Sequence, residues 1–330
     1  MGDMIAVRLK NIQLQKLLAF GALVALYIFF TIMGRNFAST ATTLNILAAS
    51  YFVGFLAIGV TFVIITGGID LSIGAVMMCA ALVGGELYRI HNVPLWLALI
   101  AMVLFGTAFG LVNGLLVTRL KLPPFIATLG TMLVALGLGA IITSSQSRFF
   151  PNILEDDAWF SRVFLRTQGN FPMGAVFLGV YFIIGMIVLN KTKLGRYVFA
   201  VGSNEEAVRL SGVRADRWKC AAYVISGLSA GLGAIFYAAA YLVIIPNTGN
   251  GLELQAIAAV VIGGTSLAGG IGSLTGTMIG VFIMSTLSVG LVSMNLPAPY
   301  QTFFSGIVVI CAVLLDIHRN NKANKVKKVS

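Results

Sequence analysis

The chain has 330 residues, of which 58% are hydrophobic and only 10% are charged, and its mean hydropathy is +0.95. Soluble domains carry about a quarter charged residues, so this composition excludes an ordinary soluble protein and indicates a polytopic membrane protein. The net charge of +11 does not indicate nucleic-acid binding, because the lysines and arginines lie at the ends of apolar segments, as topology signals do.

The apolar segments predict an all-α polytopic membrane helix bundle with about ten transmembrane segments. A basic arm at 1–16 and a basic tail at 317–330 flank a single transmembrane domain at 17–316. The predicted spans are 17–33, 46–65, 73–88, 95–117, 125–143, 173–189, 220–245, 255–268, 271–294 and 300–315. Because 255–268 is short for a crossing of about 30 Å, eight spans plus re-entrant pieces form an alternative.

The lysines and arginines are distributed unevenly among the loops of this topology. With ten spans and the N-terminus inside, the inner segments hold 17 of them and the outer loops hold five. This asymmetry follows the rule that basic residues accumulate on the cytoplasmic side. It predicts that both termini and the charged loop at 190–219 face the cytoplasm.

The loop at 190–219 is expected to contain one short helix with a signal at each end. Ser203-Asn204-Glu205-Glu206 has the pattern of a capping box, in which the Ser203 hydroxyl accepts from the Glu206 amide. Gly212 suits a left-handed stop. A helix of about eight residues is marginal alone in water, so it either docks onto a protein outside this chain or packs on its own membrane domain. The residues expected at a docking contact are Ser203, Asn204, Glu205, Glu206, Ala207, Leu210, Ser211 and Gly212.

The sequence lacks the motifs of an enzyme. It has no P-loop, and its two histidines, His91 and His318, lie at segment ends, which gives no zinc pair and no activated nucleophile. We therefore predict no catalytic residue and no metal site. Ion-driven carriers place ionisable groups within the membrane, whereas the acidic residues here only border the apolar segments. The pattern favours a transporter whose energy arrives from a separate subunit.

Glycines predict both close helix packing and helix breaks. The small-xxx-small patterns at 106–110 and 276–280 let helices approach closely. The segments 67–74 and 263–270 share the spacing GGxxLxxG. Where glycines break a membrane helix, the freed backbone groups can line an aqueous cavity. These breaks therefore provide candidates for a transport pathway.

The candidate pathway residues have two interpretations each. Asp70 and Ser72 either cap the helix that follows them or belong to a gate. Phe125, Thr128 and Thr131 share one helical face, which either packs against neighbours or faces the pathway. The residues predicted to line a substrate pathway or gate are Thr66, Gly67, Asp70, Ser72, Phe125, Thr128, Thr265 and Ser266.

Three motifs in order give the chain a family resemblance. They are VIITGGIDLSIG at 63–74, KLGRY with GSNEEA and LSGV within 193–213, and ELQAIAAVVIGGTSLAGG at 253–270. The chain resembles the permease subunits of ATP-binding cassette (ABC) sugar importers of the ribose/galactoside type, from about residue 40 to residue 316. It departs from the family pattern at Gln255, Val289 and Ser305, and these departures bear on which sugar is carried.

The resemblance implies a function and a set of partners. It implies a multi-pass protein of the bacterial cytoplasmic (inner) membrane that moves a monosaccharide, ribose- or galactose-like, inward. Its partners would be a second permease subunit, identical or not, an ATP-binding cassette subunit contacting 203–213, and an extracytoplasmic sugar-binding protein. The chain itself would hold no cofactor, because ATP and Mg belong to the partner. The alternatives are a nucleoside or autoinducer-like furanosyl substrate and, from another class, an ion-coupled secondary carrier.

Overall fold

The computed structural model describes residues 2–152, 154–166 and 170–329 and is almost entirely helical. In chain order its elements are α1 (Gly2–Met33), α2 (Thr40–Ile65), α3 (Ile73–Arg89), α4 (Leu95–Thr118), α5 (Pro124–Ile142), β1 (Arg148–Phe149), α6 (Trp159–Phe164), α7 (Met173–Lys191), α8 (Lys193–Ser203), α9 (Glu205–Leu210), α10 (Ala215–Tyr241), β2 (Val243–Ile244), α11 (Leu252–Ile262), α12 (Leu274–Ser293) and α13 (Ala298–Val329). The two strands form one short antiparallel pair. The predicted all-α bundle is confirmed apart from this pair.

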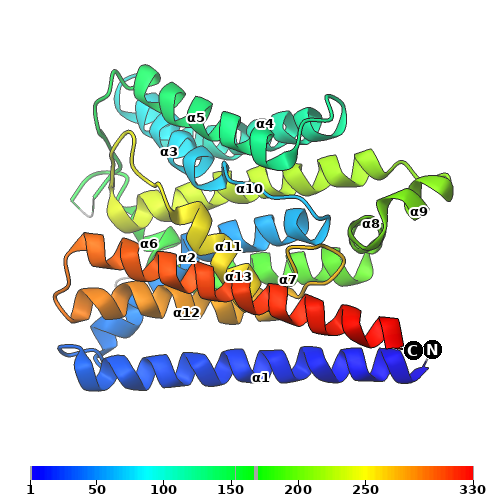
Figure 1. Ribbon diagram of the computed structural model, residues 1–330. Coiled ribbons are helices and arrows are strands. Elements are labelled where there is room, and N and C mark those ends of the chain that lie inside the picture. Colours follow the sequence, from blue (N-terminus) through cyan, green and yellow to red (C-terminus); the bar gives the residue numbers. More distant parts are fainter. Residues whose placement is uncertain (1, 153, 167–169, 330) are drawn as a thin grey trace.

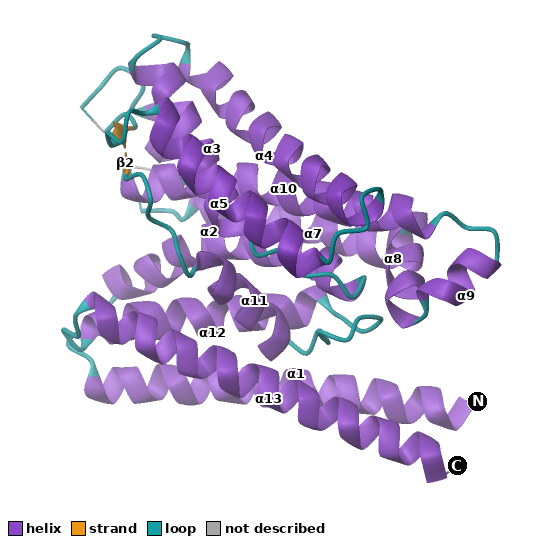
Figure 2. Ribbon diagram, turned by 45° about the horizontal axis from the view of Figure 1, so that its top comes forward, coloured by secondary structure: helices purple, strands orange, loops and turns teal. Residues whose placement is uncertain are grey.

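The long helices run roughly along one common direction (Figure 1). The two chain termini, the turn between α4 and α5, and the short helices α8 and α9 lie at one end of the molecule. The segment between α5 and α7 and the strand pair lie at the other end. An ion pair between Lys121 and Asp216 joins the α4–α5 turn to the start of α10 at 2.9 Å. Figure 2 shows α1, α12 and α13 as neighbours on one side of the bundle.

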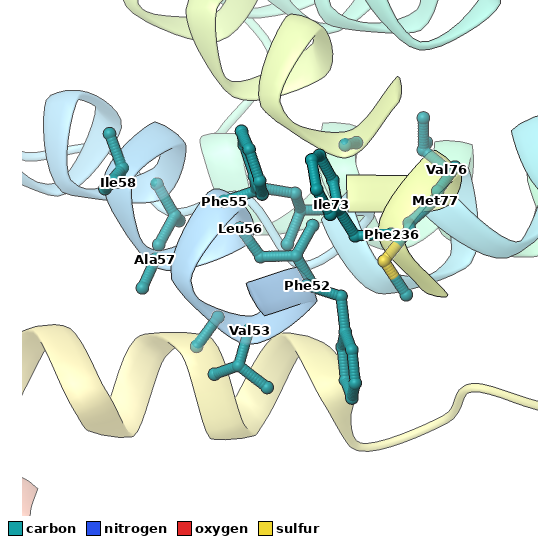
Figure 3. Packing of buried hydrophobic residues seen from close by; sticks show 14 of the residues in the cluster. Phe52, Val53, Phe55, Leu56, Ala57, Ile58, Ile73, Val76, Met77 and Phe236 are labelled. Atoms are coloured by element: carbon teal, nitrogen blue, oxygen red, sulfur yellow. The ribbon is translucent and has the colours of Figure 1, made fainter. Parts of the chain in front are cut away.

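Helix α2 forms the centre of the bundle. Nearly all of its residues from Ser50 to Ile65 are buried, and it packs against α7, α10, α11 and α12. Phe55 and Leu56 lie near Phe236 of α10 and Met77 of α3 in the hydrophobic core (Figure 3). The Phe52 ring points away from them and contacts Tyr237 and Tyr241 of α10. The ring of Phe55 stacks on that of Phe236 at 4.6 Å between centroids. Because its sequence is apolar all round, α2 needs no polar face and can be enclosed on every side.

Six of the described helices are long and apolar enough to cross a membrane: α2, α4, α5, α7, α10 and α12. Shorter apolar helical stretches are Leu17–Met33, Leu252–Ile262 and Pro299–Leu314. Helix α11 has 11 residues and so measures about 16 Å, roughly half of the membrane core. The span predicted at 255–268 is therefore wrong as a continuous helix, because Gly263 and Gly264 end it early.

The small-xxx-small prediction at 106–110 is confirmed by the contact between α4 and α10. A Cβ at Gly106 would lie 2.6 Å from the Gly231 amide nitrogen, and one at Gly110 would lie 2.9 Å from the Gly227 Cα. Glycines thus face glycines, and the two backbones touch. The pattern at 276–280 acts likewise, since its glycines meet backbone atoms of α11 and its C-terminal turn.

We expect Gly227→Ala to destabilise the protein and Gly137→Ala to leave it at least as stable. A Cβ at Gly227 would lie 2.6 Å from backbone atoms of Gly110, which cannot rotate away, and such overpacking costs about 1–3 kcal/mol. Gly137 of α5 has no atom within 4 Å of the added carbon, and alanine is the better helix former. Thermal unfolding in detergent measures both variants. Equal midpoints for the two would contradict the close contact.

Candidate functional site

Two helices in the middle of the bundle end at glycine breaks of the same geometry. α2 is followed by Gly67 with φ +77°, and α11 is followed by Gly264 with φ +92°. In each case the left-handed glycine amide and the next amide bond back to carbonyls of the last turn. This is the Schellman arrangement, which stops a helix while pairing its free carbonyls. The spacing shared by the two segments therefore corresponds to two equivalent helix stops.

The two breaks meet each other and the end of α8. The Gly270 amide donates to the Ile65 carbonyl at 2.9 Å, which joins the second break to the end of α2. A Cβ at Gly202, in the last turn of α8, would overlap that carbonyl and would lie 2.6 Å from the Gly270 nitrogen. Backbone therefore touches backbone at this junction. A displacement of α8 must move both breaks.

Asp70 is the centre of a buried polar network in the first break. Its carboxylate is 1% exposed. One oxygen accepts from the Ser72 amide at 3.0 Å and from the Ser72 hydroxyl at 2.6 Å, and the other accepts from the Ser226 hydroxyl at 2.7 Å. A buried carboxylate is costly unless donors surround it. The three donors, two from the break and one from α10, supply that compensation.

The network continues from Ser72 into α4 and α5. The Asn113 amide group donates to the Ser72 hydroxyl oxygen at 2.7 Å, and the Thr131 hydroxyl donates to the Asn113 carbonyl oxygen at 2.6 Å. The Tyr223 hydroxyl donates to the Ile69 carbonyl at 3.3 Å. The Thr128 hydroxyl, which donates to the Pro124 carbonyl at 2.8 Å, lies 3.4 Å from the same Ile69 carbonyl. Side chains from α4, α5 and α10 therefore fix the path of the first break.

The structure divides the predicted pathway residues. Ser72 stands at the N-cap position of α3 but makes no side-chain cap bond, so its predicted capping role is wrong: its hydroxyl is used by Asp70 and Asn113. Asp70 pairs with the amide of Ser72, just before the helix, rather than with amides of the first turn. Thr128 is buried, whereas Phe125 is 53% exposed on the outside of α5.

Of the remaining pathway candidates, Thr66, Thr265 and Ser266 are buried at the two breaks, whereas Gly67, the left-handed residue of the first break, is exposed. The Thr66 hydroxyl donates to the Val63 carbonyl at 2.7 Å. Thr265 accepts from the Ser273 amide at 3.4 Å, and Ser266 lies 3.5 Å from a carboxylate oxygen of Asp316 in α13. Each of these groups supports the local backbone turn. Their role in transport stays a prediction.

Sequence reasoning missed Asn113, Ser226 and Tyr223, although they complete the network. Asn113 is a single amide side chain within the apolar helix α4 and is 1% exposed. A polar group in such a position needs an internal partner, since lipid provides none. That isolation was the available signal for Asn113. Ser226 carries a weaker signal, because it lies in a run of small residues that also suits helix packing.

The charged loop contains two helices rather than one. Helix α8 continues through Ser203, so Ser203 cannot cap the next helix and the predicted capping box is wrong. Asn204 is the cap: its backbone is extended, and its side-chain oxygen accepts from the Ala207 amide at 3.0 Å. Helix α9 then has six residues rather than about eight. The predicted left-handed stop at Gly212 is confirmed, with φ +80°.

One face of α9 packs on its own chain. Val208 is buried in a small cluster with Val201 of α8 and Ala215 of α10. Glu205 forms ion pairs with Arg209 and with Lys219. Burial alone would raise the pKa of Glu205, but its hydrogen bonds to Lys219 and Arg209 outweigh burial and hold that pKa below its usual value. Packing on the membrane domain, one of the two sequence interpretations, is therefore observed.

The opposite face of α9 is free. Ala207 and Ser211 are exposed, and Leu210 is 83% exposed. None of these three residues belongs to the buried hydrophobic cluster around Val208, so this face of the helix is accessible to a partner. The two interpretations of this helix are thus compatible, because each applies to a different face.

We expect Glu205→Gln to loosen α9 at neutral pH, whereas Glu206→Gln should not. Glu206 makes no ion pair within the described structure, so it is a matched control. Because its folded pKa is lowered, Glu205 stabilises the folded loop above its unfolded pKa of about 4.3, and this contribution disappears as pH falls through the lower folded value. Partly exposed ion pairs contribute about 0.2–1 kcal/mol, so amide hydrogen exchange over 205–210 should quicken by a factor of about 1.4 to 5. Identical exchange rates in both variants would show that the ion pairs of Glu205 do not stabilise α9.

Comparison with known proteins identifies the chain. Residues 42–313 match a family described as the permease component of branched-chain amino acid transport systems. The chain belongs to this family of permeases. No solved structure matches this permease.

Curated relatives cover nearly the whole permease. It is 39% identical over 304 residues to the ribose import permease of Bacillus subtilis (strain 168), covering 92% of this chain and 93% of the relative. It is 33% identical over 306 residues to the fructose import permease of Bifidobacterium longum (strain NCC 2705), covering 89% of each. It is 33% identical over 299 residues to the autoinducer 2 import system permease of Photorhabdus luminescens, covering 89% of this chain and 87% of the relative.

Family membership and the apolar helices together indicate where the protein is located and which kind of transport complex it belongs to. The permease is a multi-pass protein of the bacterial inner membrane. As a permease component of an ABC importer, it works with an ATPase and a binding protein. The predicted resemblance to sugar-importer permeases is confirmed.

Proposed function

We propose that the permease carries a monosaccharide inward while a separate ATP-binding cassette subunit hydrolyses ATP. ATP and Mg would bind to that subunit, and this chain would hold no cofactor of its own. The relatives named for ribose and fructose import support a sugar of this size. The relative named for autoinducer 2 import supports the alternative, a furanosyl-like substrate.

The free face of α9 is the observation that carries the proposal. Ala207, Leu210 and Ser211 form a small exposed surface on a short helix that is itself held by Val208 and Glu205. A partner whose cleft closes around this face can displace α9 without unfolding it, because the opposite face remains packed on the chain. Because α8 abuts both glycine breaks, such a push reaches the interior of the bundle through backbone contacts.

We further propose ten crossings with both termini in the cytoplasm. The six long helices, the three shorter apolar stretches and α3 supply the crossings, with α11 completed by its flanking turns. The termini, α8, α9 and the α4–α5 turn share one end of the molecule (Figure 1), and the basic residues concentrate in those segments. This distribution supports a cytoplasmic location for that end.

The opposite end would receive the sugar-binding protein, and a second permease copy would complete the pathway. The segment between α5 and α7 presents Trp159 and the acidic side chain of Glu155, which pairs with Arg89 at 2.6 Å. The exposed Phe125 on α5 fits a pathway formed between two permease subunits rather than inside one. The second permease subunit would be either identical to this chain, in a homodimer, or a different permease chain, in a heterodimer.

Reconstitution into liposomes tests the proposal. Sugar uptake should require the ATP-binding subunit, the binding protein and internal ATP, and it should not follow a sodium or proton gradient applied to the permease alone. Uptake by the permease alone, driven by an ion gradient, would establish the secondary-carrier alternative. A thermal-shift screen of the cognate binding protein against ribose, galactose, fructose, nucleosides and furanosyl compounds would then identify the substrate.

We expect a cysteine at Ser203 to resist an impermeant maleimide in intact spheroplasts and to react after permeabilisation. Ser203 is exposed at the end that we place in the cytoplasm. Leu154→Cys is the matched control, since Leu154 is 90% exposed at the opposite end and should react without permeabilisation. The reverse labelling pattern would invert the topology.

A further inference from the structure

A basic hollow lies where α4 ends and the turn between α9 and α10 begins. It has a volume of about 500 Å³, within the range of small-molecule sites. Four arginines line it, accompanied by a single acidic residue, Asp216. The arginines are Arg119, Arg209, Arg214 and Arg217.

The lining has an excess of positive charge that the chain itself does not neutralise. Asp216 is already paired with Arg209 at 2.8 Å and with Lys121 at 2.9 Å. In the described part of the chain, Arg119, Arg214 and Arg217 form no ion pair. Three guanidinium groups directed to one hollow repel one another unless an anion lies between them. Guanidinium groups also match phosphate oxygens in geometry.

The start of α10 adds to the attraction for an anion. Arg214 occupies the N-cap position and makes no side-chain cap bond, so no side chain of the cap residue pairs with the first amides. α10 has 27 residues, and a helix N-terminus carries a partial positive charge and free amide groups. A bound phosphate would supply the missing acceptors.

The surface beside the hollow indicates where the phosphate comes from. Arg119 directly follows α4, and the adjoining Leu120 is 66% exposed. Leu111, about two turns earlier in α4, is 46% exposed, so apolar surface continues along this helix. A free phosphate ion would make no use of this apolar surface, whereas acyl chains would cover it. We propose that the hollow binds the headgroup phosphate of an anionic phospholipid whose chains lie along α4. The proposal depends on the membrane location and not on the transported sugar.

Native mass spectrometry of the full-length permease with added lipid tests the site. The probes are dioleoylphosphatidylglycerol and, as the neutral comparison, dioleoylphosphatidylcholine. The test variant is Arg119→Gln/Arg214→Gln/Arg217→Gln. The control variant, Lys191→Gln/Lys193→Gln/Arg196→Gln, removes the same charge from the 190–219 loop at positions outside the hollow.

We expect the wild type and the control variant to prefer phosphatidylglycerol, and the test variant to lose that preference by at least about tenfold. If the test and control variants lose the preference for phosphatidylglycerol equally, the preference comes from general surface charge, and the proposed lipid site is wrong. Displacement of the lipid by inorganic phosphate, with no dependence on acyl chains, would make the hollow a phosphate site instead. If the test variant keeps its lipid preference but no longer assembles with the ATP-binding subunit, the arginines bind that subunit and not a lipid.

The single variant Arg217→Gln keeps the test valid if the triple variant does not fold. Arg217 is exposed and lies outside the buried cluster around Val208, so its loss leaves the packing of α9 intact. It should weaken phosphatidylglycerol binding several-fold with unchanged elution of the protein. Full retention of binding in this well-folded variant would contradict the proposal.

Discussion

Ala207→Arg is expected to abolish sugar uptake and binding-protein-stimulated ATP hydrolysis together, while the permease inserts and folds normally. Ala207 lies on the free face of α9, away from the Val208 cluster, so a larger side chain there meets solvent in the isolated permease. In the assembled importer it would meet the cleft of the ATP-binding subunit. A hot-spot residue at the centre of an interface costs about 2 kcal/mol or more when altered, so an arginine forced into such a point should cause a loss of at least roughly thirtyfold.

The measurement is ATPase activity and uptake of the full complex in nanodiscs and liposomes. Ala207→Ser is the matched control, because it keeps a small side chain at the same position and should retain both activities. Gly212→Asn and Gly212→Val form a second pair: asparagine tolerates the left-handed backbone at φ +80°, whereas a β-branched residue resists it. If Ala207→Arg keeps normal sugar uptake and normal stimulated ATP hydrolysis, α9 does not transmit the conformational change of the ATP-binding subunit to the permease.

Asp70→Ala is expected to lower the amount and the thermal stability of the folded permease severely, and Asp70→Asn is expected to spare both. Alanine removes the acceptor for the buried Ser72 amide and for the Ser226 hydroxyl, and each unsatisfied buried group costs about 1–3 kcal/mol. Asparagine keeps one oxygen toward Ser72, and its amide group can donate to Ser226. The network therefore predicts near wild-type thermal stability for Asp70→Asn and a strong loss of stability for Asp70→Ala.

Comparing abundance with uptake distinguishes the two roles of Asp70. Thermal unfolding and membrane abundance report the network, and uptake in the complete importer reports the pathway. We expect Asp70→Asn to transport close to wild-type rates, because the carboxylate is enclosed by its own donors. Loss of uptake at wild-type abundance would instead place its charge in the transport pathway. Equal thermal stability of Asp70→Asn and Asp70→Ala would show that the hydrogen bonds of Asp70 do not stabilise the fold.

Much of the bundle was predictable because the helix ends carry strong local signals. The predicted segments 73–88 and 95–117 match α3 and α4 to within one residue, since turns containing glycine or proline precede both. The start of α2 was predicted six residues late, at 46 rather than at Thr40. Residues 40–45 include three threonines and an asparagine, which average hydropathy does not assign to a span, whereas Ser39 caps the helix.

The candidate site was less predictable because it depends on tertiary neighbours. Asp70 and Ser72 were identified from the motif, but their partners lie 41 residues away at Asn113 and 156 residues away at Ser226. Helix α8 was missed because 193–203 combines two charged residues, Lys193 and Arg196, with two glycines, and this composition is typical of a loop between membrane spans. Its backbone is nevertheless helical through Ser203, and this shifted the cap to Asn204.

The central position of α2 has a consequence for how the protein is made. At about 5–20 residues per second, α2 leaves the ribosome on the order of 10–30 s before α10, its main covering helix. During that interval its hydroxyls would face lipid. Ser50 and Thr61 already donate to carbonyls four residues earlier, at 2.7 and 2.6 Å. These two hydroxyls therefore have partners within α2 itself, so they remain hydrogen-bonded in the bilayer before the helices that later cover them have been translated.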